Sequence, residues 1–128
     1  MKNKDIYTSA INLLAQNADE NINEDYEERA PYLIASFCNE ISEMDSAVRK
    51  ALGIEKSSGF DRVWIDLEED FPMLDRFVSA AIKYLAAMLV IDEDGELSDK
   101  LYEMYCDGIS KIRSQIPCIL EKTANRYS

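Results

Sequence analysis

Acidic side chains are the groups in this sequence most able to do chemistry, and one run of them falls at residues 92–95 (DEDG). The acids and glycine have the character of a calcium-binding loop, in which the glycine holds the sixth position. That register makes Val90 the first ligand and Leu101 the last. Neither side chain carries a carboxylate, so the sequence favours a solvated turn between two helices.

A second acidic group lies in the middle of the chain, before a predicted helix. Carboxylates at this density can bind a hard cation such as Mg²⁺ or Ca²⁺. They also suit the start of a helix, where the helix dipole stabilises negative charge. We favour the helix-start role over a metal site. The group consists of Asp66, Glu68, Glu69, Asp70 and Asp75.

Other catalytic groups are scarce. The sequence has no histidine, which removes the commonest general base and metal ligand, and its 4 glycines are scattered rather than gathered in a phosphate-binding loop. Cys38, Cys106 and Cys118 form no CxxC pair, and each falls in an apolar helical pattern. We therefore expect three small buried hydrophobes, no enzymatic activity, no bound metal and no cofactor.

The net charge of −11 sets the classes of partner that we expect. It opposes direct binding to nucleic acid and to an anionic membrane, since both require basic side chains. It suits a basic protein partner, although the same charge also serves to keep a protein in solution. The N-terminal residues lack an apolar signal region, and the apolar stretch 77–91 is too short to span a bilayer, so we expect a cytoplasmic protein.

The elements that must position these groups are helices. A short first helix is predicted to end near Gln16, with Asn3 or Asp5 as its cap, and a polar connection follows over residues 17–25. The second helix covers about 25–52 and stops at Gly53. Pro31 either begins this helix near Arg29 or kinks a longer one, and we favour the kink.

Two further helices are predicted to form an antiparallel hairpin. The first covers about 72–91, with Pro72 in its first turn and Asp70 as its cap, and it is apolar around nearly its whole circumference. The second covers about 97–116 and ends at Pro117, with Met104 and Gly108 on its inner face. Gly108 there predicts close approach of another helix.

The segment 54–70 is the least helical part of the sequence, and it carries a Ser-Ser-Gly run followed by Val63, Ile65 and Leu67 at alternating positions. It is either a short extended piece or an ordinary loop. Phe60 and Trp64 lie within it, and they either anchor an interface or close the open end of the core. Core positions are expected for three other aromatic residues. These are Phe37, Phe77 and Tyr105.

These features together predict an all-α fold. We expect residues 1–128 to form a single-domain helical bundle of four to five helices, with a central antiparallel helix hairpin and the irregular segment 54–70. The C-terminal tail, 117–128, has room for one more helical turn.

The order of elements resembles that of small phage and prophage head–tail connector (neck adaptor) proteins. The likeness is carried by four segments, YTSAINLLAQN, DYEERAPYLIASFCNEI, FPMLDRFVSAAIKYLAAMLVIDED and LSDKLYEMYCDGISKI. In that group a helix with small residues and aromatics ends in an acidic turn and precedes a helix with regularly spaced tyrosines. The matching residues here are Ala80, Ala81, Tyr84, Ala86 and Ala87, then Asp92 to Glu96, then Tyr102 and Tyr105.

The resemblance implies a virion structural protein that binds portal and neck proteins and joins copies of itself in a ring. It would be found in the bacterial host cytoplasm and then in the virion. In such adaptors the C-terminal tail often docks on the portal, and the end of this chain is its most basic part, which makes Lys122 and Arg126 candidate interface residues beside Phe60 and Trp64. The alternative is a small acidic regulatory or assembly protein that binds a basic protein partner.

Overall fold

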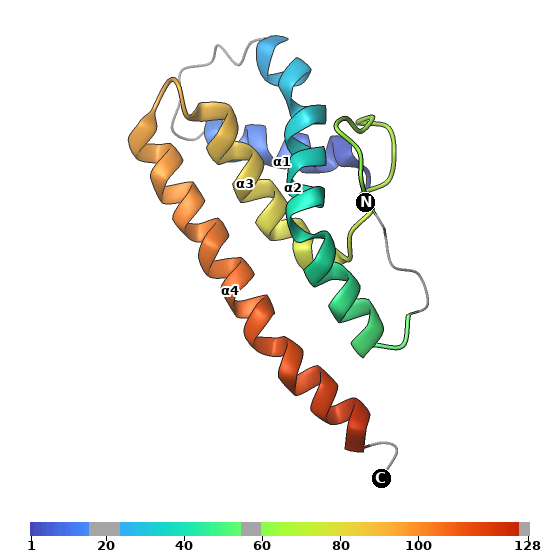
Figure 1. The fold of residues 1–128 in the computed structure, drawn as a ribbon. Helices are drawn as coiled ribbons and strands as arrows, with labels where there is room; N and C mark the ends of the chain where they lie inside the picture. Colours follow the sequence, from blue (N-terminus) through green and yellow to red (C-terminus); the bar gives the residue numbers. More distant parts are fainter. Residues whose placement is uncertain (16–23, 55–59, 126–128) are drawn as a thin grey trace.

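The chain folds as an all-α bundle, which confirms the predicted fold class (Figure 1). The structure is a computed structural model that describes residues 1–15, 24–54 and 60–125, with backbone alone for 15, 24 and 117–125. Most of the predicted polar connection 17–25 lies outside the described residues. The elements in the described part are α1 (Asn3–Ala15), α2 (Glu24–Ala51), the 3₁₀ turn η1 (Asp75–Phe77), α3 (Val78–Val90) and α4 (Gly95–Asn125).

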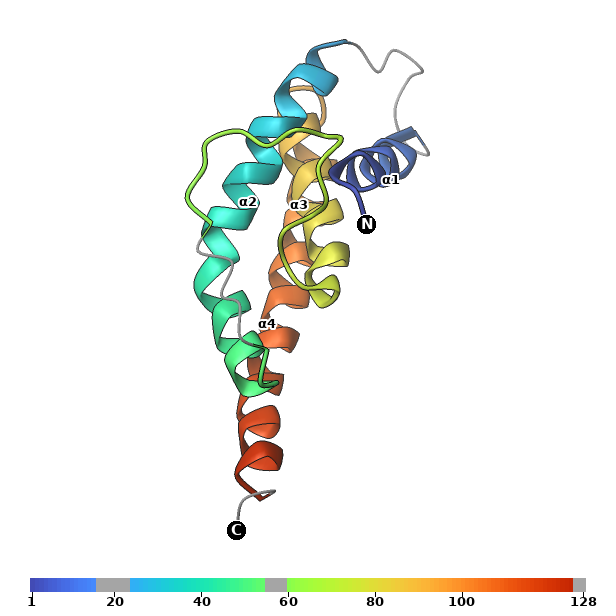
Figure 2. The same ribbon diagram turned by 90° about the vertical axis from the view of Figure 1, so that its right-hand side faces the viewer.

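Helix α3 lies at the centre of the bundle, as its apolar circumference predicted. It packs against α1, α2 and α4, and the two views show α1 crossing α3 while α4 runs antiparallel beside it (Figures 1 and 2). A turn of only a few residues, 91–94, joins α3 to α4, which confirms the central hairpin. The buried residues of α3 are Ala80, Ala81, Tyr84, Leu85, Ala86, Ala87, Leu89 and Val90.

An aromatic cluster ties three of the elements together around Phe37 of α2. The ring centre of Phe37 lies 5.6 Å from that of Tyr84, 6.0 Å from that of Tyr105 and 6.2 Å from that of Phe71. The Tyr84 hydroxyl forms a hydrogen bond with Ser36 Oγ at 3.1 Å, so its polar atom is satisfied inside the core. Each aromatic pair adds about 1 kcal/mol beyond the burial of its area.

Helix α2 is one long helix with Pro31 inside it, so Pro31 does not mark its start. The helix ends where Gly53 takes a φ of 76°, a left-handed conformation that glycine adopts at low cost. The N–H of Gly53 bonds to the Lys50 carbonyl at 3.2 Å, and the N–H of Ile54 bonds to the Arg49 carbonyl at 2.8 Å. These two bonds form a Schellman motif, as the position of Gly53 predicted.

Helix α4 does not end at Pro117, so the prediction of a separate tail over 117–128 is wrong as far as Asn125. Residues 126–128 lie outside the described part. Proline in a helix loses the hydrogen bond that its missing N–H would give to residue 113. The neighbouring residues, including Leu120, Glu121 and Lys122, are good helix formers, which favours continuation of the helix beyond that single lost bond.

The predicted start of the third helix at Pro72 is also wrong, because the helical conformation begins at Asp75. Leu74 is extended, with φ −63° and ψ 150°, and its N–H donates to Asp45 Oδ1 of α2 at 2.8 Å. This bond to α2 holds the backbone away from the helical conformation. Asp70, predicted as the cap, lies instead in an isolated bridge with Lys2.

The first residues of the chain are bound to the irregular segment. The N–H of Asn3 donates to the Glu69 carbonyl at 3.0 Å, and the N–H of Phe71 donates to the Met1 carbonyl at 2.8 Å. Asn3 does not cap α1. Its side chain is fully buried and donates through Nδ2 to the Asp66 carbonyl at 3.0 Å. Asp5 lies inside the first turn of α1 and accepts the N–H of Lys2 at 3.3 Å, so neither predicted residue is the N-cap.

No strand occurs in the described residues of the irregular segment, 54 and 60–70. The predicted alternation fails, because Val63 is 79% exposed while Ile65 is buried. The inner face predicted for the fourth helix also needs correction at Met104, which is 48% exposed. At Gly108 an added Cβ would meet no atom within 4 Å, so this glycine does not serve a close helix contact.

Candidate functional site

Residues 60–65 cross the outer side of α2, where two hydrogen bonds hold the chain (Figure 2). Asn39 donates through Nδ2 to the Arg62 carbonyl at 2.7 Å. About two turns nearer the start of α2, the Pro31 carbonyl accepts the N–H of Ile65 at 3.3 Å. The Ile65 side chain is buried, so this segment is fixed by both backbone and core contacts.

Arg62 braces the same segment through its side chain. Its two terminal nitrogens bind the two carboxylate oxygens of Glu69, each at 3.0 Å, and its guanidinium lies 5.9 Å from the centre of the Phe60 ring. The hydrogen bonds from Arg62 lower the pKa of the Glu69 carboxyl, and the same bonds raise the pKa of Arg62. A bidentate pair of this kind fixes direction as well as distance.

The braced segment presents apolar side chains to solvent. Trp64 is 44% exposed, Val63 is 79% exposed, and Tyr32, the residue after Pro31 on α2, is 55% exposed. We call these three residues the Trp64 surface. Phe60 differs from them, since it is partly buried and packs against the core. Its position suits the covering of the core, whereas that of Trp64 suits an interface anchor, and the interface role stays a prediction for both.

Of the other two predicted interface residues, Lys122 and Arg126, only the backbone of Lys122 is described. Lys122 belongs to the last part of α4, which continues past the end of α2, and Arg126 lies beyond the described residues (Figures 1 and 2). The structure therefore does not bring Lys122 next to Phe60 and Trp64. The four candidates do not form a single site.

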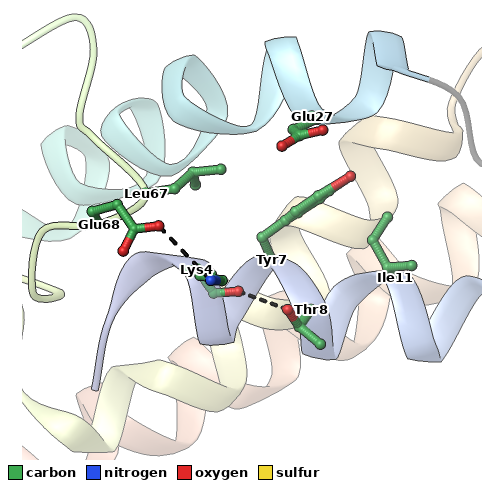
Figure 3. A pocket seen from close by; sticks show the side chains of 7 residues that line it. All are labelled: Lys4, Tyr7, Thr8, Ile11, Glu27, Leu67 and Glu68. Carbon is green, nitrogen blue, oxygen red and sulfur yellow. Dashed lines mark hydrogen bonds and ion pairs between the residues drawn. The ribbon is translucent and has the colours of Figure 1, made fainter.

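A shallow hollow of about 380 Å³ lies beside the irregular segment, between α1 and the start of α2 (Figure 3). Lys4 Nζ lies 3.8 Å from a carboxylate oxygen of Glu68, and the Thr8 hydroxyl donates to the Lys4 carbonyl at 3.0 Å. Burial, and then the charge of Glu27, raise the pKa of the Tyr7 phenol, so it is neither base nor nucleophile at neutral pH. The lining residues are Lys4, Tyr7, Thr8, Ile11, Glu27, Leu67 and Glu68.

The members of the acidic group at residues 66–70 serve the loop itself, so the role predicted for them at a helix start is wrong. Asp75, the last member of the group, does lie in the first turn of η1. Asp66 Oδ1 accepts the N–H of Glu68 at 2.9 Å, which closes a local turn. Glu68 lies near Lys2 and Lys4, at 3.7 and 3.8 Å, and Glu69 pairs with Arg62. Within the described part of the chain, no three acidic or cysteine side chains are grouped closely enough to hold a metal ion.

The acidic run at residues 92–95 lies at the turn between α3 and α4. Asp94 Oδ1 accepts the N–H of Leu97 at 3.1 Å, as expected of a residue that caps the start of α4. Glu93 accepts a hydrogen bond from the Tyr26 hydroxyl. Burial, and then this bond to Glu93, raise the pKa of Tyr26.

Arg29 is a residue whose role sequence reasoning missed. Its side chain donates to the Met88 carbonyl at 2.9 Å and to the Leu89 carbonyl at 3.4 Å, where α3 ends. A positive charge at this end of a helix is favourable, because the dipole is negative there. The only signal in the sequence is that Arg29 falls among acidic residues near the start of α2.

The two cysteines with described side chains differ in their surroundings. Cys38 is fully buried, and burial raises the pKa of its thiol to about 12. Cys106 is exposed, so the prediction that it is a buried hydrophobe is wrong. It follows Tyr105 directly, and one step along a helix turns the side chain by about 100° away from the core. The side chain of Cys118 lies outside the described part.

Comparisons with protein-family models, with curated proteins and with solved structures gave no match. A search of the described residues found no helix both apolar enough and long enough to cross a membrane.

Proposed function

We propose that this protein is a head–tail connector adaptor of a phage or prophage, and that it binds portal and neck proteins. It would be present in the bacterial host cytoplasm and then in the virion. The proposal draws on the element order, in which a small-residue helix ends in an acidic turn and leads into a long tyrosine-bearing helix. In the folded chain these are α3, the turn at residues 91–94 and α4.

One observation carries the proposal. The segment that carries Trp64 lies beside α2 between Pro31 and Asn39, whereas the last part of α4 projects past the far end of α2, away from that segment (Figures 1 and 2). An adaptor needs two separate docking surfaces, because it joins two different neighbours. The Trp64 surface supplies an apolar anchor on a braced loop, and the end of α4 supplies a projecting helix with Lys122.

An adaptor of this kind works as one of several copies in a ring around the portal. Rings arise when one patch of a protomer contacts a different patch of the next and the rotation closes. Contacts of that type need not be stable before the portal arranges the copies. The free protein is therefore expected to be a monomer that assembles on its partner.

The experiment is to mix the purified protein with the portal protein from the same genome and to image the product. Added ring density on the portal is the expected result, and its absence would overturn the proposal. Trp64→Ala should weaken the neck-side contact, while K122E with R126E should weaken portal docking. Ile91→Ala is the matched control, since Ile91 is 49% exposed but lies on neither surface.

A second candidate function is that of a small acidic regulatory or assembly protein that binds a basic protein partner. The net charge of −11 favours it. Binding of a basic protein that weakens steeply with salt, without any affinity for the portal, would support this candidate over the adaptor. Genomic position separates the two as well, since an adaptor gene is expected between the capsid and tail-tube genes.

A further inference from the structure

A groove of about 290 Å³ is lined by residues of η1, α3 and α4, and the two helices run side by side in Figure 1. It has no part in the adaptor proposal, because it lies neither at the Trp64 surface nor on the last part of α4. Its described lining contains no carboxylate. The lining residues are Arg76, Ser79, Ala80, Lys83, Met104, Gly108, Lys111, Ile112 and Gln115.

Positive charge is concentrated in this groove although the protein as a whole carries −11. Arg76, Lys83 and Lys111 line it, and within the described part of the chain none of the three forms an ion pair. Lys83 Nζ donates to Ser79 Oγ at 2.9 Å, which leaves two of its three N–H groups for another acceptor. Other described cations, such as Arg49 and Arg62, are already bound to carboxylates.

The floor of the groove is apolar and open. An atom added at the Cβ position of Gly108 meets nothing within 4 Å, so there is free space over the backbone of α4. Met104, one turn earlier on the same helix, is 48% exposed at the rim, while Ala80 and Ile112 are buried below it. Apolar surface surrounded by charges of one sign is typical of a site that takes a protein side chain together with opposite charges.

We propose that this groove is the docking site for an acidic segment of another protein. An apolar side chain of that segment fills the space over Gly108 and Ala80. Its flanking carboxylates meet Arg76, Lys83 and Lys111. Three separated cations around an apolar floor match carboxylates spaced along a peptide. The pairing would neutralise charges that form no ion pair with any described residue.

Nucleic acid fits the groove less well. A phosphate backbone needs a continuous track of cations, and the −11 charge of the whole protein repels a polyanion beyond the three groove residues. A short acidic peptide segment places its negative charges only beside the groove cations, so it is repelled less by the rest of the protein than a long polyanion is. The apolar floor also has no partner in a sugar–phosphate chain.

The test uses the full-length protein and a fluorescent peptide in which glutamates flank a single leucine, with binding followed by fluorescence anisotropy. The triple variant R76E/K83E/K111E should weaken binding by at least about tenfold, since three charge pairs are lost and repulsion replaces them. The matched control is K50E/K100E/R113E, which gives the same net charge by reversing cations that line other parts of the surface. It should change binding by less than about threefold.

Gly108→Leu tests the apolar part of the site separately. The new side chain enters free space and replaces a glycine in a helix interior, so the melting temperature should stay constant or rise. It should also occupy the space that the peptide leucine would take, and binding should fall to that of a control peptide with serine in place of leucine. An unchanged affinity would overturn the apolar part of the proposal.

Three other results would overturn the docking site as a whole. Equal weakening by the two triple variants would mean that binding reflects total charge alone. Tighter binding of a single-stranded oligonucleotide or of inorganic phosphate than of the peptide would assign the groove to a different ligand. Self-association of the wild-type protein that R76E/K83E/K111E abolishes would assign it to a second copy of this chain.

Discussion

Asp45 Oδ1 accepts the backbone N–H of Leu74 at 2.8 Å, and this bond joins the last third of α2 to the residue before η1. The second oxygen, Oδ2, accepts Arg49 Nε at 2.7 Å, and Arg49 donates in turn to the Pro72 carbonyl at 3.0 Å. Asp45 is fully buried. One ion pair therefore fixes where the irregular segment stops and where the helical hairpin begins.

Asp45→Ala should lower the free energy of unfolding by about 3 kcal/mol, because it removes the buried carboxylate that accepts hydrogen bonds from Arg49 Nε and from the Leu74 N–H. Asp45→Asn keeps the volume and one acceptor, so it should cost less. Urea denaturation followed by circular dichroism measures both. Asp61→Ala, at an exposed position, is the control and should stay within about 0.5 kcal/mol of wild type. A loss in D45A no larger than in D61A would contradict the role of Asp45.

The two described thiols should react at very different rates. Burial raises the pKa of Cys38 to about 12, whereas Cys106 is exposed, so only Cys106 should react with a disulfide reagent at about pH 8. A C118S background removes the third thiol from the measurement. The absorbance of the released product should show one thiol per molecule reacting rapidly in the native protein, and a second thiol reacting only in denaturant. Two fast equivalents would contradict the burial of Cys38.

The Arg62–Glu69 pair should make a contribution to stability that depends on pH. The fold lowers the pKa of Glu69 below its ordinary value of 4.5, so the stabilisation is present above 4.5 and is lost as the pH falls through the lower folded value. The difference in unfolding free energy between wild type and R62Q should therefore shrink as the pH is lowered below 4.5. Lys50→Gln removes an exposed cation elsewhere. Its difference in unfolding free energy from wild type should not change with the titration of Glu69.

Pro117→Ala should strengthen the last part of α4 locally. It restores the N–H that a helix donates to the carbonyl of residue 113, and it removes the clash of the proline ring with that turn. Amide hydrogen exchange should slow for the residues after 117, by roughly tenfold or more. Exchange in α3 should not change, which provides the internal control. Faster exchange after 117 would show that the proline supports the helix.

The helices and the core could be predicted from the sequence because they depend on local periodicity. The apolar residues of α3 and the positions of Phe37, Phe77 and Tyr105 followed from spacing alone, and all three aromatic residues are buried. The residues at the edges of the buried helix faces could not be predicted from spacing in the same way. Met104 and Cys106 adjoin buried residues along α4, and the helical period alone does not fix how far the neighbouring helix covers each side.

The contacts that organise the irregular segment could not be predicted, since they join residues far apart in the chain. Asn3 bonds to Asp66, Asp45 bonds to Leu74, and Ile65 bonds to Pro31. Each looks like an ordinary polar or apolar residue in its own neighbourhood of sequence. The predicted helix end at Pro117 and the predicted helix start at Pro72 are wrong for a related reason. In both places contacts outside the local sequence decide whether the backbone is helical, so the proline alone does not.

The continuity of α4 has a mechanical consequence. From residue 117 to residue 125 the helix extends by roughly 14 Å, at a rise of about 1.5 Å per residue. The same helix places Leu101, Tyr105 and Ile109 in the core, where it packs against α3. Its last part therefore projects from a segment that is held in the core. Because Tyr105 of the same helix lies 6.0 Å from the Phe37 ring centre, a force that displaced the far end of α4 would act on the aromatic cluster around Phe37.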